Sequence, residues 1–132
     1  MATICFDVDG VVAQPNWPHY AGAKPYPFAI EQVNRLYDDG HTIVFLTARY
    51  MGLTGQNQQK AKEMGEWELR RWLDRCGFKY HAVFLGKPSA DFYVDDRAFQ
   101  VRSEDGEADW QRLVFELGRR KDGMEKGSCL PT

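Results

Sequence analysis

Four short apolar runs, each nearly continuous, limit the folds open to this chain more than any other feature. The runs span Thr3 to Asp7, Thr42 to Thr47, Ala82 to Leu85 and Phe92 to Asp95. Strands whose apolar residues do not alternate with polar ones are typical of parallel sheets that are covered on both faces. We therefore expect these runs to form four strands of one mainly parallel sheet.

Three further segments carry apolar residues at helical spacing. They are PFAIEQVNRLYDDG from residue 27, a segment from Gln58 to Cys76 that Gly77 ends, and EADWQRLVFELGRR from residue 107, whose helix we expect to start near Ser103 or Asp105. Strands that alternate with helices pair in parallel through right-handed crossovers. The order of elements predicts a three-layer α/β sandwich with a Rossmann-like sheet.

Length and composition indicate a single domain. The chain has 132 residues and a formal net charge of -2, so we expect one domain over residues 1–120 and a loosely ordered tail over residues 121–132. No run approaches the roughly 20 apolar residues of a membrane span, and the N-terminus lacks the pattern of a secretion signal. Three cysteines without C-x-x-C spacing fit a reducing compartment, with Cys5 buried. We expect a cytoplasmic protein.

Acidic residues stand where two of the predicted strands end. Asp7 and Asp9 close the first strand, and Asp95 and Asp96 close the last. In open α/β sheets, ligands bind beyond the carboxyl ends of the strands. Four carboxylates at one edge repel each other by about 3 kcal/mol per pair at 5 Å and an effective dielectric of 20, and a bound cation removes that cost. All-oxygen ligands beside a phosphate favour Mg²⁺.

The same edge is predicted to hold a hydroxyl and an ammonium group. Thr47 ends the second strand, and Lys87 follows the third after a glycine. Both groups suit the oxygens of a phosphoryl group. A carboxylate nucleophile, a second carboxyl group, Mg²⁺, Lys87 and Thr47 together describe phosphoryl transfer through an aspartyl-phosphate.

These residues, in this order, resemble the haloacid dehalogenase (HAD) superfamily of phosphotransferases. The four motifs are DVDG, FLTAR with Thr47, GKP with Lys87, and YVDDR, and together they span Ile4 to Arg97. The short gaps between the motifs leave no room for a large cap domain, as in the capless members. The segments HYAGAKPYP, LYDDGH, FLTARYMG and GKPSADFYVDDRA further resemble small HAD-type proteins found with bacterial capsule and surface-sugar genes.

The resemblance implies a role for each matching residue. Asp7 would be the nucleophile and Asp9 the general acid/base. The Asp7 carboxylate, the Asp9 backbone carbonyl and either Asp95 or Asp96 would hold Mg²⁺. Thr47 and Lys87 would bind the phosphoryl group. The sequence departs from the family pattern at Val11, where many members have threonine.

Several interpretations stay open at this point. Arg49 and Arg97 can bind substrate anions or pair with the acids. The segment from Pro15 to Pro27, rich in proline and aromatic residues, can be a flap that faces the substrate or can be ordinary loop packing.

The function stays open between related classes as well. A small phosphorylated metabolite such as a sugar phosphate is the first expectation for the substrate, and a nucleotide or a nucleic-acid end is the alternative, against which the net charge argues mildly. A phospho-receiver domain is disfavoured, because its phosphorylated aspartate follows a middle strand, where this chain has Thr47. A non-catalytic phosphate-binding subunit and a homo-oligomer also stay open.

Overall fold

The structure, a computed structural model, describes residues 1–102 and 106–127, with side chains described as far as residue 119. Its elements, in chain order, are β1 (Thr3–Asp7), the 3-10 helix η1 (Tyr20–Gly22), α1 (Pro27–Asp38), β2 (Thr42–Thr47), α2 (Gln58–Cys76), β3 (Ala82–Leu85) and α3 (Gly106–Gly127). The predicted α/β fold with a parallel sheet and no large cap domain is confirmed.

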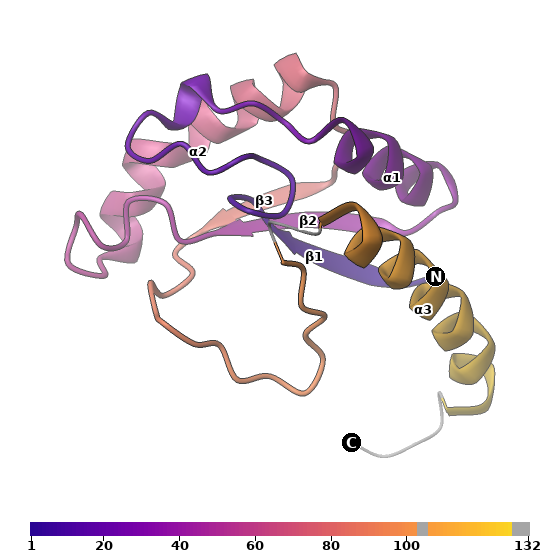
Figure 1. Ribbon diagram of the computed structural model, residues 1–132. Coiled ribbons are helices and arrows are strands. Elements are labelled where there is room, and N and C mark those ends of the chain that lie inside the picture. Colours follow the sequence, from indigo (N-terminus) through magenta and orange to yellow (C-terminus); the bar gives the residue numbers. More distant parts are fainter. Residues whose placement is uncertain (103–105, 128–132) are drawn as a thin grey trace.

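The sheet has the strand order β1-β2-β3, and both strand pairs are parallel. Its register pairs Phe6 with Phe45 and Phe45 with Val83, so these three side chains share one face. Because the strands are parallel, their carboxyl ends meet at a single edge (Figure 1). This edge is where the sequence places Asp7, Thr47 and Lys87.

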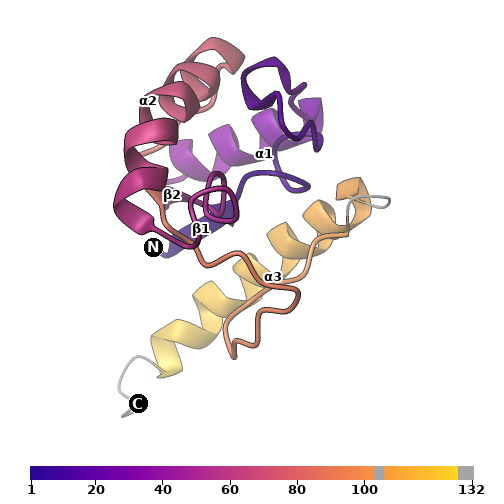
Figure 2. The same ribbon diagram turned by 90° about the vertical axis from the view of Figure 1, so that its left-hand side faces the viewer.

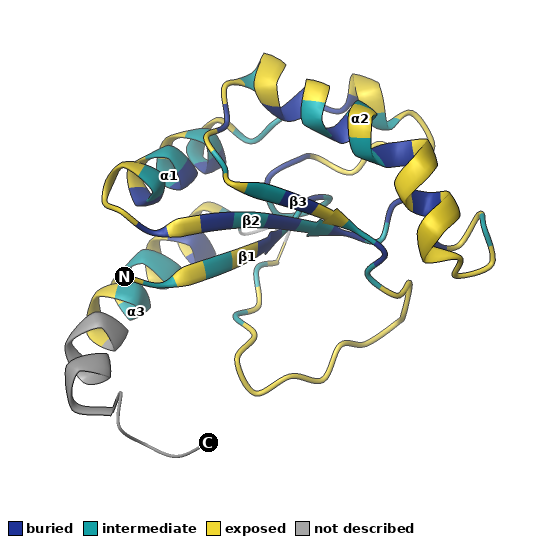
Figure 3. Cartoon of the chain, turned by 180° about the vertical axis from the view of Figure 1, so that it is seen from behind, coloured by how far each residue is buried: buried dark blue, intermediate teal, exposed yellow. Residues whose placement is uncertain are grey.

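Helices α1 and α2 lie over the same face of the sheet (Figures 1 and 3). Phe45 from β2 and Trp72 from α2 are both buried and both contact the Phe78 ring. The predicted bounds of α2 are confirmed by its two ends. The Asn57 side chain accepts a hydrogen bond of 2.9 Å from the backbone N–H of Lys60, and Gly77 ends the helix with a φ of 89°.

Helix α3 lies beside β1 and packs near α1, and its far end extends away from the sheet (Figures 1 and 2). Trp110 fixes this position, because its ring stacks on Phe6 at 5.1 Å between centroids and meets Phe28 edge-on at 6.4 Å. The expected start of this helix near Ser103 or Asp105 falls outside the described residues. The backbone of α3 continues to Gly127, past the expected boundary at residue 120.

The opposite face of the sheet is only partly covered by the described residues. Cys5 and Phe84 are exposed there, and Val44 and Leu46 are half-buried. A three-layer sandwich has helices on both faces, whereas α1 and α2 both cover the face that carries Phe6. The prediction that Cys5 is buried is therefore wrong, because its side chain points to the open face.

The fourth predicted strand, Phe92 to Asp95, does not form. These residues belong to the loop 86–102, which lies on the side of the sheet opposite α1 and α2 (Figures 1 and 3). Phe92 is 87% exposed and Val94 is 99% exposed. Local hydrogen bonds take the place of a strand ladder, since Tyr93 donates its hydroxyl to the Pro88 carbonyl at 2.5 Å and Asp95 accepts from the Arg97 N–H at 2.8 Å.

Within residues 1–102 and 106–127, no helix combines the length and the apolar character that crossing a lipid bilayer requires.

Candidate active site at the carboxyl edge of the sheet

The backbone brings three of the predicted site residues together at the carboxyl edge. Asp7 pairs with Leu46 in the register, and Thr47 pairs with Leu85. The Lys87 N–H then donates to the Thr47 carbonyl at 3.2 Å, which extends the pairing of β2 with β3 beyond the strand end. Asp7, Thr47 and Lys87 therefore lie on neighbouring chain segments, as the sequence predicts.

A tight turn after β1 returns the chain close to Asp7. The Val8 carbonyl accepts hydrogen bonds from the N–H groups of Val12 at 2.9 Å and Ala13 at 3.0 Å. Gly10 has a φ of 85°, a left-handed conformation that glycine adopts without the steric cost that a side chain adds. This turn places the Asp9 side chain at the same edge.

The Asp7 carboxylate has one close cation. Its Oδ2 atom lies 3.5 Å from Nζ of Lys87, and its Oδ1 atom accepts a hydrogen bond of 2.9 Å from the Val8 N–H. Burial raises the pKa of Asp7 above its usual value, while Lys87 and the Val8 hydrogen bond oppose that rise. The carboxylate is therefore less fully solvated than one at the surface, which suits a nucleophile at neutral pH.

Asp9 forms a two-point ion pair with Arg49. Nε of Arg49 donates to Oδ2 of Asp9 at 2.9 Å, and Nη2 donates to Oδ1 at 2.9 Å. Arg49 is buried, at 2% exposure, whereas Asp9 is partly exposed. Of the two interpretations that the sequence leaves open for Arg49, the structure places it against an acid.

Thr47 is buried, and its hydroxyl oxygen accepts a hydrogen bond of 3.1 Å from the Arg49 N–H. This contact uses a lone pair of the hydroxyl and leaves its O–H to donate to another oxygen. The Thr47 hydroxyl therefore fixes the backbone of Arg49, two residues further along the chain. Its role toward a phosphoryl group stays a prediction.

Lys87 is held from two sides. Gly86, with a φ of 99°, turns the chain beside Gln58, whose side-chain amide donates to the Gly86 carbonyl at 3.0 Å. The ring of Tyr93 lies 4.1 Å from Nζ of Lys87. Its ammonium group therefore lies near both an aromatic ring and the Asp7 carboxylate.

The remaining predicted site residues lie apart from this group. Asp95, Asp96 and Arg97 are all exposed in the loop 86–102, where Asp95 turns back to accept from the Arg97 N–H. Among the residues that the structure describes, no group of three or more His, Cys, Asp or Glu side chains is arranged to hold a metal ion. The described residues do not bring Asp95 and Asp96 together with Asp7 and Asp9, so the role of these acids toward Mg²⁺ stays a prediction.

The segment from Pro15 to Pro27 packs on helix α2. The Trp72 indole N–H donates to the Ala23 carbonyl at 2.8 Å, and the Arg75 guanidinium donates to the Ala21 carbonyl at 2.8 Å. The interpretation as loop packing is therefore supported for this part of the segment. Trp17 is exposed.

Two aromatic residues were not predicted as neighbours of the site cations. Tyr20 lies 4.5 Å from the Arg49 guanidinium, and Tyr93 lies beside Lys87. The sequence points to Tyr20 only as one of several aromatic residues in the segment from Pro15 to Pro27, which follows Asp9. It does not point to Tyr93, which the strand pattern assigned to a sheet.

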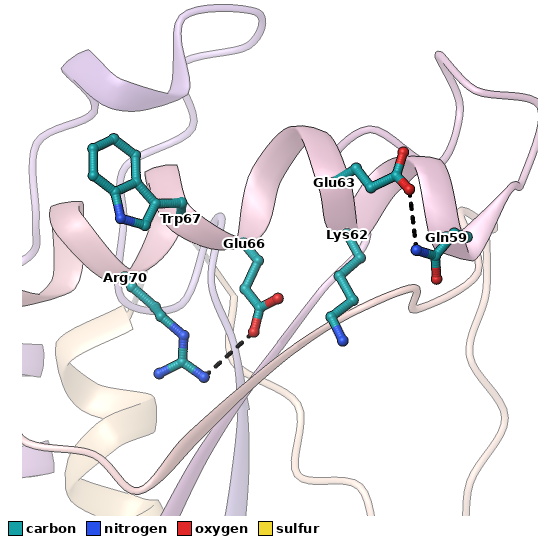
Figure 4. Close-up of a pocket in the computed structure, with 6 residues that line it drawn as sticks. All are labelled: Gln59, Lys62, Glu63, Glu66, Trp67 and Arg70. Carbon is teal, nitrogen blue, oxygen red and sulfur yellow. Dashed lines mark hydrogen bonds and ion pairs between the residues drawn. The ribbon is translucent and has the colours of Figure 1, made fainter.

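A shallow hollow of about 350 Å³ lies elsewhere, on the outer face of α2 (Figure 4). Its lining residues are Gln59, Lys62, Glu63, Glu66, Trp67 and Arg70. None of them is a predicted site residue, and all come from one helix. We therefore place the candidate site at the carboxyl edge of the sheet.

The chain resembles known proteins in its fold and, over part of its length, in its sequence. No family model matches the chain. The chain is similar to a structural-genomics target protein from Vibrio cholerae whose crystal structure is known. The two have 29% identical residues and a TM-score of 0.72, and the match covers 88% of this chain and 98% of that one. This match shows the same small fold without a cap.

A Bacillus cereus protein named "Putative nucleotidase" is 33% identical over 63 residues, which are 48% of this chain. The match spans only 27% of that relative's length. A D,D-heptose 1,7-bisphosphate phosphatase from B. bronchiseptica, solved with magnesium and phosphate, is 20% identical with a TM-score of 0.47, over 92% of this chain and 64% of that one. The first match shows the fold, and the second is a likeness over less than half of this chain.

Proposed function

We propose that this chain is a phosphomonoester hydrolase of the HAD type, with Asp7 as the nucleophile. The observation that carries the proposal is the convergence of Asp7, Thr47 and Lys87 at one edge, with Nζ of Lys87 3.5 Å from the Asp7 carboxylate. A lysine beside a carboxylate nucleophile attracts a phosphate dianion that the carboxylate alone would repel.

The reaction has two displacements at phosphorus. An Asp7 oxygen attacks the phosphorus atom, the ester P–O bond breaks, and the leaving oxygen keeps the electron pair and takes a proton from Asp9 in its acid form. Water then attacks the aspartyl-phosphate and gives its proton to Asp9. The P–O bond to Asp7 breaks, so that Asp7 is regenerated and inorganic phosphate leaves.

Lys87 and the Thr47 hydroxyl bind the phosphoryl oxygens in this scheme. Their charge and hydrogen bonds act where negative charge develops during each displacement. Lys87 also balances the charge of Asp7 before substrate binds. The Tyr93 ring, 4.1 Å from Nζ, helps to hold the ammonium group in place.

Mg²⁺ dependence is part of the proposal because of the four sequence motifs. A bound ion would neutralise charge on the phosphoryl group. The described residues do not gather the ligands for it, since Asp95 and Asp96 lie in the exposed loop. In the proposed scheme, the side chains of Asp7, Asp9, Thr47 and Lys87 carry out both displacements.

A small sugar phosphate is the first substrate that we propose. A nucleotide is the second, favoured by the likeness to the nucleotidase over 63 residues. Both are small phosphate esters that an edge without a cap domain admits. The net charge of -2 gives no general attraction for a nucleic-acid chain.

The test is phosphate release from a panel of sugar phosphates, nucleotides and 3'-phosphorylated oligonucleotides, with Mg²⁺ and with a chelator. Wild type should release phosphate, form an acid-stable phosphoryl adduct detectable by mass spectrometry, and lose activity with the chelator. Asp7→Asn should abolish both the release and the adduct.

Asp39→Asn is the matched control, because Asp39 is an exposed aspartate at the C-terminus of α1. It should leave the activity unchanged. Phosphate release that persists in Asp7→Asn would refute the assignment. Binding of phosphate esters without turnover in wild type would instead support the non-catalytic subunit.

A further inference from the structure

The two-point ion pair between Asp9 and Arg49 joins the predicted acid/base to a side chain that cannot reach solvent. We infer that Arg49 is a positioning residue, which fixes the direction of the Asp9 carboxylate and does not bind substrate. The inference rests on the proposed function, in which Asp9 exchanges protons with the leaving oxygen and with water. It replaces the substrate-binding role that the sequence left open for Arg49.

Both oxygens of Asp9 accept charge-assisted hydrogen bonds of 2.9 Å from the guanidinium. The two parallel bonds fix the plane of the carboxylate as well as its distance, because the fork of an arginine is flat and rigid. A single donor such as a lysine ammonium sets only the distance. The geometry therefore restricts the rotation of the Asp9 side chain.

Arg49 is itself held firmly. Its guanidinium carbon lies 4.5 Å from the centre of the Tyr20 ring and 6.0 Å from that of the Trp72 ring. Its N–H donates to the Thr47 hydroxyl at 3.1 Å. Only 2% of the surface of Arg49 is exposed, and its Nη1 atom is buried without a hydrogen-bond partner among the described residues.

The next residue, Tyr50, anchors this segment to helix α2. Its φ is 68°, a left-handed conformation that a residue with a bulky side chain rarely adopts. The Tyr50 ring packs so closely on Gly65 that a Cβ atom there would lie 2.7 Å from it, and the Tyr50 hydroxyl donates to Glu68 at 2.8 Å. The unusual backbone turns Arg49 and Tyr50 in different directions, toward Asp9 and toward α2.

The test compares steady-state kinetics of Arg49→Met and Arg49→Lys with wild type on the best substrate of the panel. We expect kcat to fall by about 10- to 100-fold in both, less than in Asp9→Asn, because acid–base catalysis as a whole contributes roughly 100- to 10,000-fold. KM should change little, since Arg49 does not touch the phosphate. A KM increase of 10-fold or more at an unchanged kcat would overturn the inference in favour of substrate binding.

The double variant Asp9→Asn/Arg49→Met separates positioning from an independent role. If Arg49 acts only through Asp9, the double variant has the kcat of Asp9→Asn alone. A further loss equal to that of Arg49→Met by itself would refute the inference. Arg75→Met is the matched control. Arg75 donates to the carbonyl of Ala21, next to Tyr20, but does not pair with Asp9, so this variant should retain wild-type kcat.

A spectroscopic measurement tests the ion pair without any activity. In ¹⁵N spectra of the arginine side chains, the Nε–H of Arg49 should exchange slowly with solvent in wild type and rapidly in Asp9→Asn. Rapid exchange in wild type would refute the ion pair itself. Slow exchange in a wild type that has no activity would refute the proposed function but leave the Asp9–Arg49 ion pair as a structural contact. Failure of the proposed function and failure of this inference are therefore distinguishable.

Discussion

The ammonium group of Lys87 lies 3.5 Å from the Asp7 carboxylate, and this relationship joins two strands that the sheet does not pair directly. β1 and β3 flank β2, so Lys87 reaches across the end of the central strand.

Replacing Lys87 with methionine keeps a similar volume and removes the charge. We expect kcat/KM for phosphate esters to fall about 100-fold or more, because the lysine stabilises charge on the phosphoryl group. Steady-state kinetics on the best substrate measure this. Lys62→Met removes an exposed lysine on α2 as the control, and equal effects of the two variants would contradict the placement of the site.

Tyr93 covers the ammonium group of Lys87 with its ring, 4.1 Å away. Tyr93→Leu removes the attraction between the cation and the ring, which contributes roughly 0.5–1 kcal/mol at partly exposed sites. We expect KM to rise by about 2- to 5-fold, with the fold intact by circular dichroism. Tyr93→Phe retains the ring and should match wild type, whereas a loss of the same size in both variants would point to the hydroxyl.

Tyr50 should make stability depend on pH in the alkaline range. Burial, and then the hydrogen bond to Glu68, raise the pKa of Tyr50 from 10.0 to about 12 in the folded chain. Because the folded state holds this proton more tightly, the stabilising contribution is complete below pH 10 and is lost as the pH rises through 12. Urea unfolding of wild type and Tyr50→Phe at several pH values measures the difference.

Tyr50→Phe should be less stable than wild type at pH 7 by about 1 kcal/mol, the usual size of a lost hydrogen bond. Its deficit should shrink above pH 10, since the variant has no hydroxyl to ionise. A constant deficit from neutral to alkaline pH would contradict this prediction.

The loop 86–102 should tolerate the loss of its apolar side chains. Phe92 and Val94 are almost fully exposed, so the double variant Phe92→Ser/Val94→Thr should change the free energy of unfolding by less than about 0.5 kcal/mol. Chemical denaturation measures this value. A loss of several kcal/mol would show that these side chains are buried in a fourth strand in solution, as the sequence pattern predicts. Val83→Thr, at a buried position of β3, is the destabilising control.

The local elements follow from the sequence because each depends on neighbouring residues. The run from Thr42 to Thr47 forms β2 at its predicted bounds, and Gly77 ends α2 as its capping preference predicts. The meeting of Asp7, Thr47 and Lys87 follows as well, because parallel strands bring their carboxyl ends to one edge.

Only the tertiary structure decides which partner each side chain takes. Arg49 and Asp9 are 40 residues apart in the chain. From the sequence, Arg49 can pair with an acid or bind a substrate anion. The Phe92 to Asp95 segment has a strand composition, yet hydrogen bonds to Pro88 and Arg97 hold it in a loop. Composition sets what a segment can form, but competition among contacts, each of a few kcal/mol or less, determines what it does form.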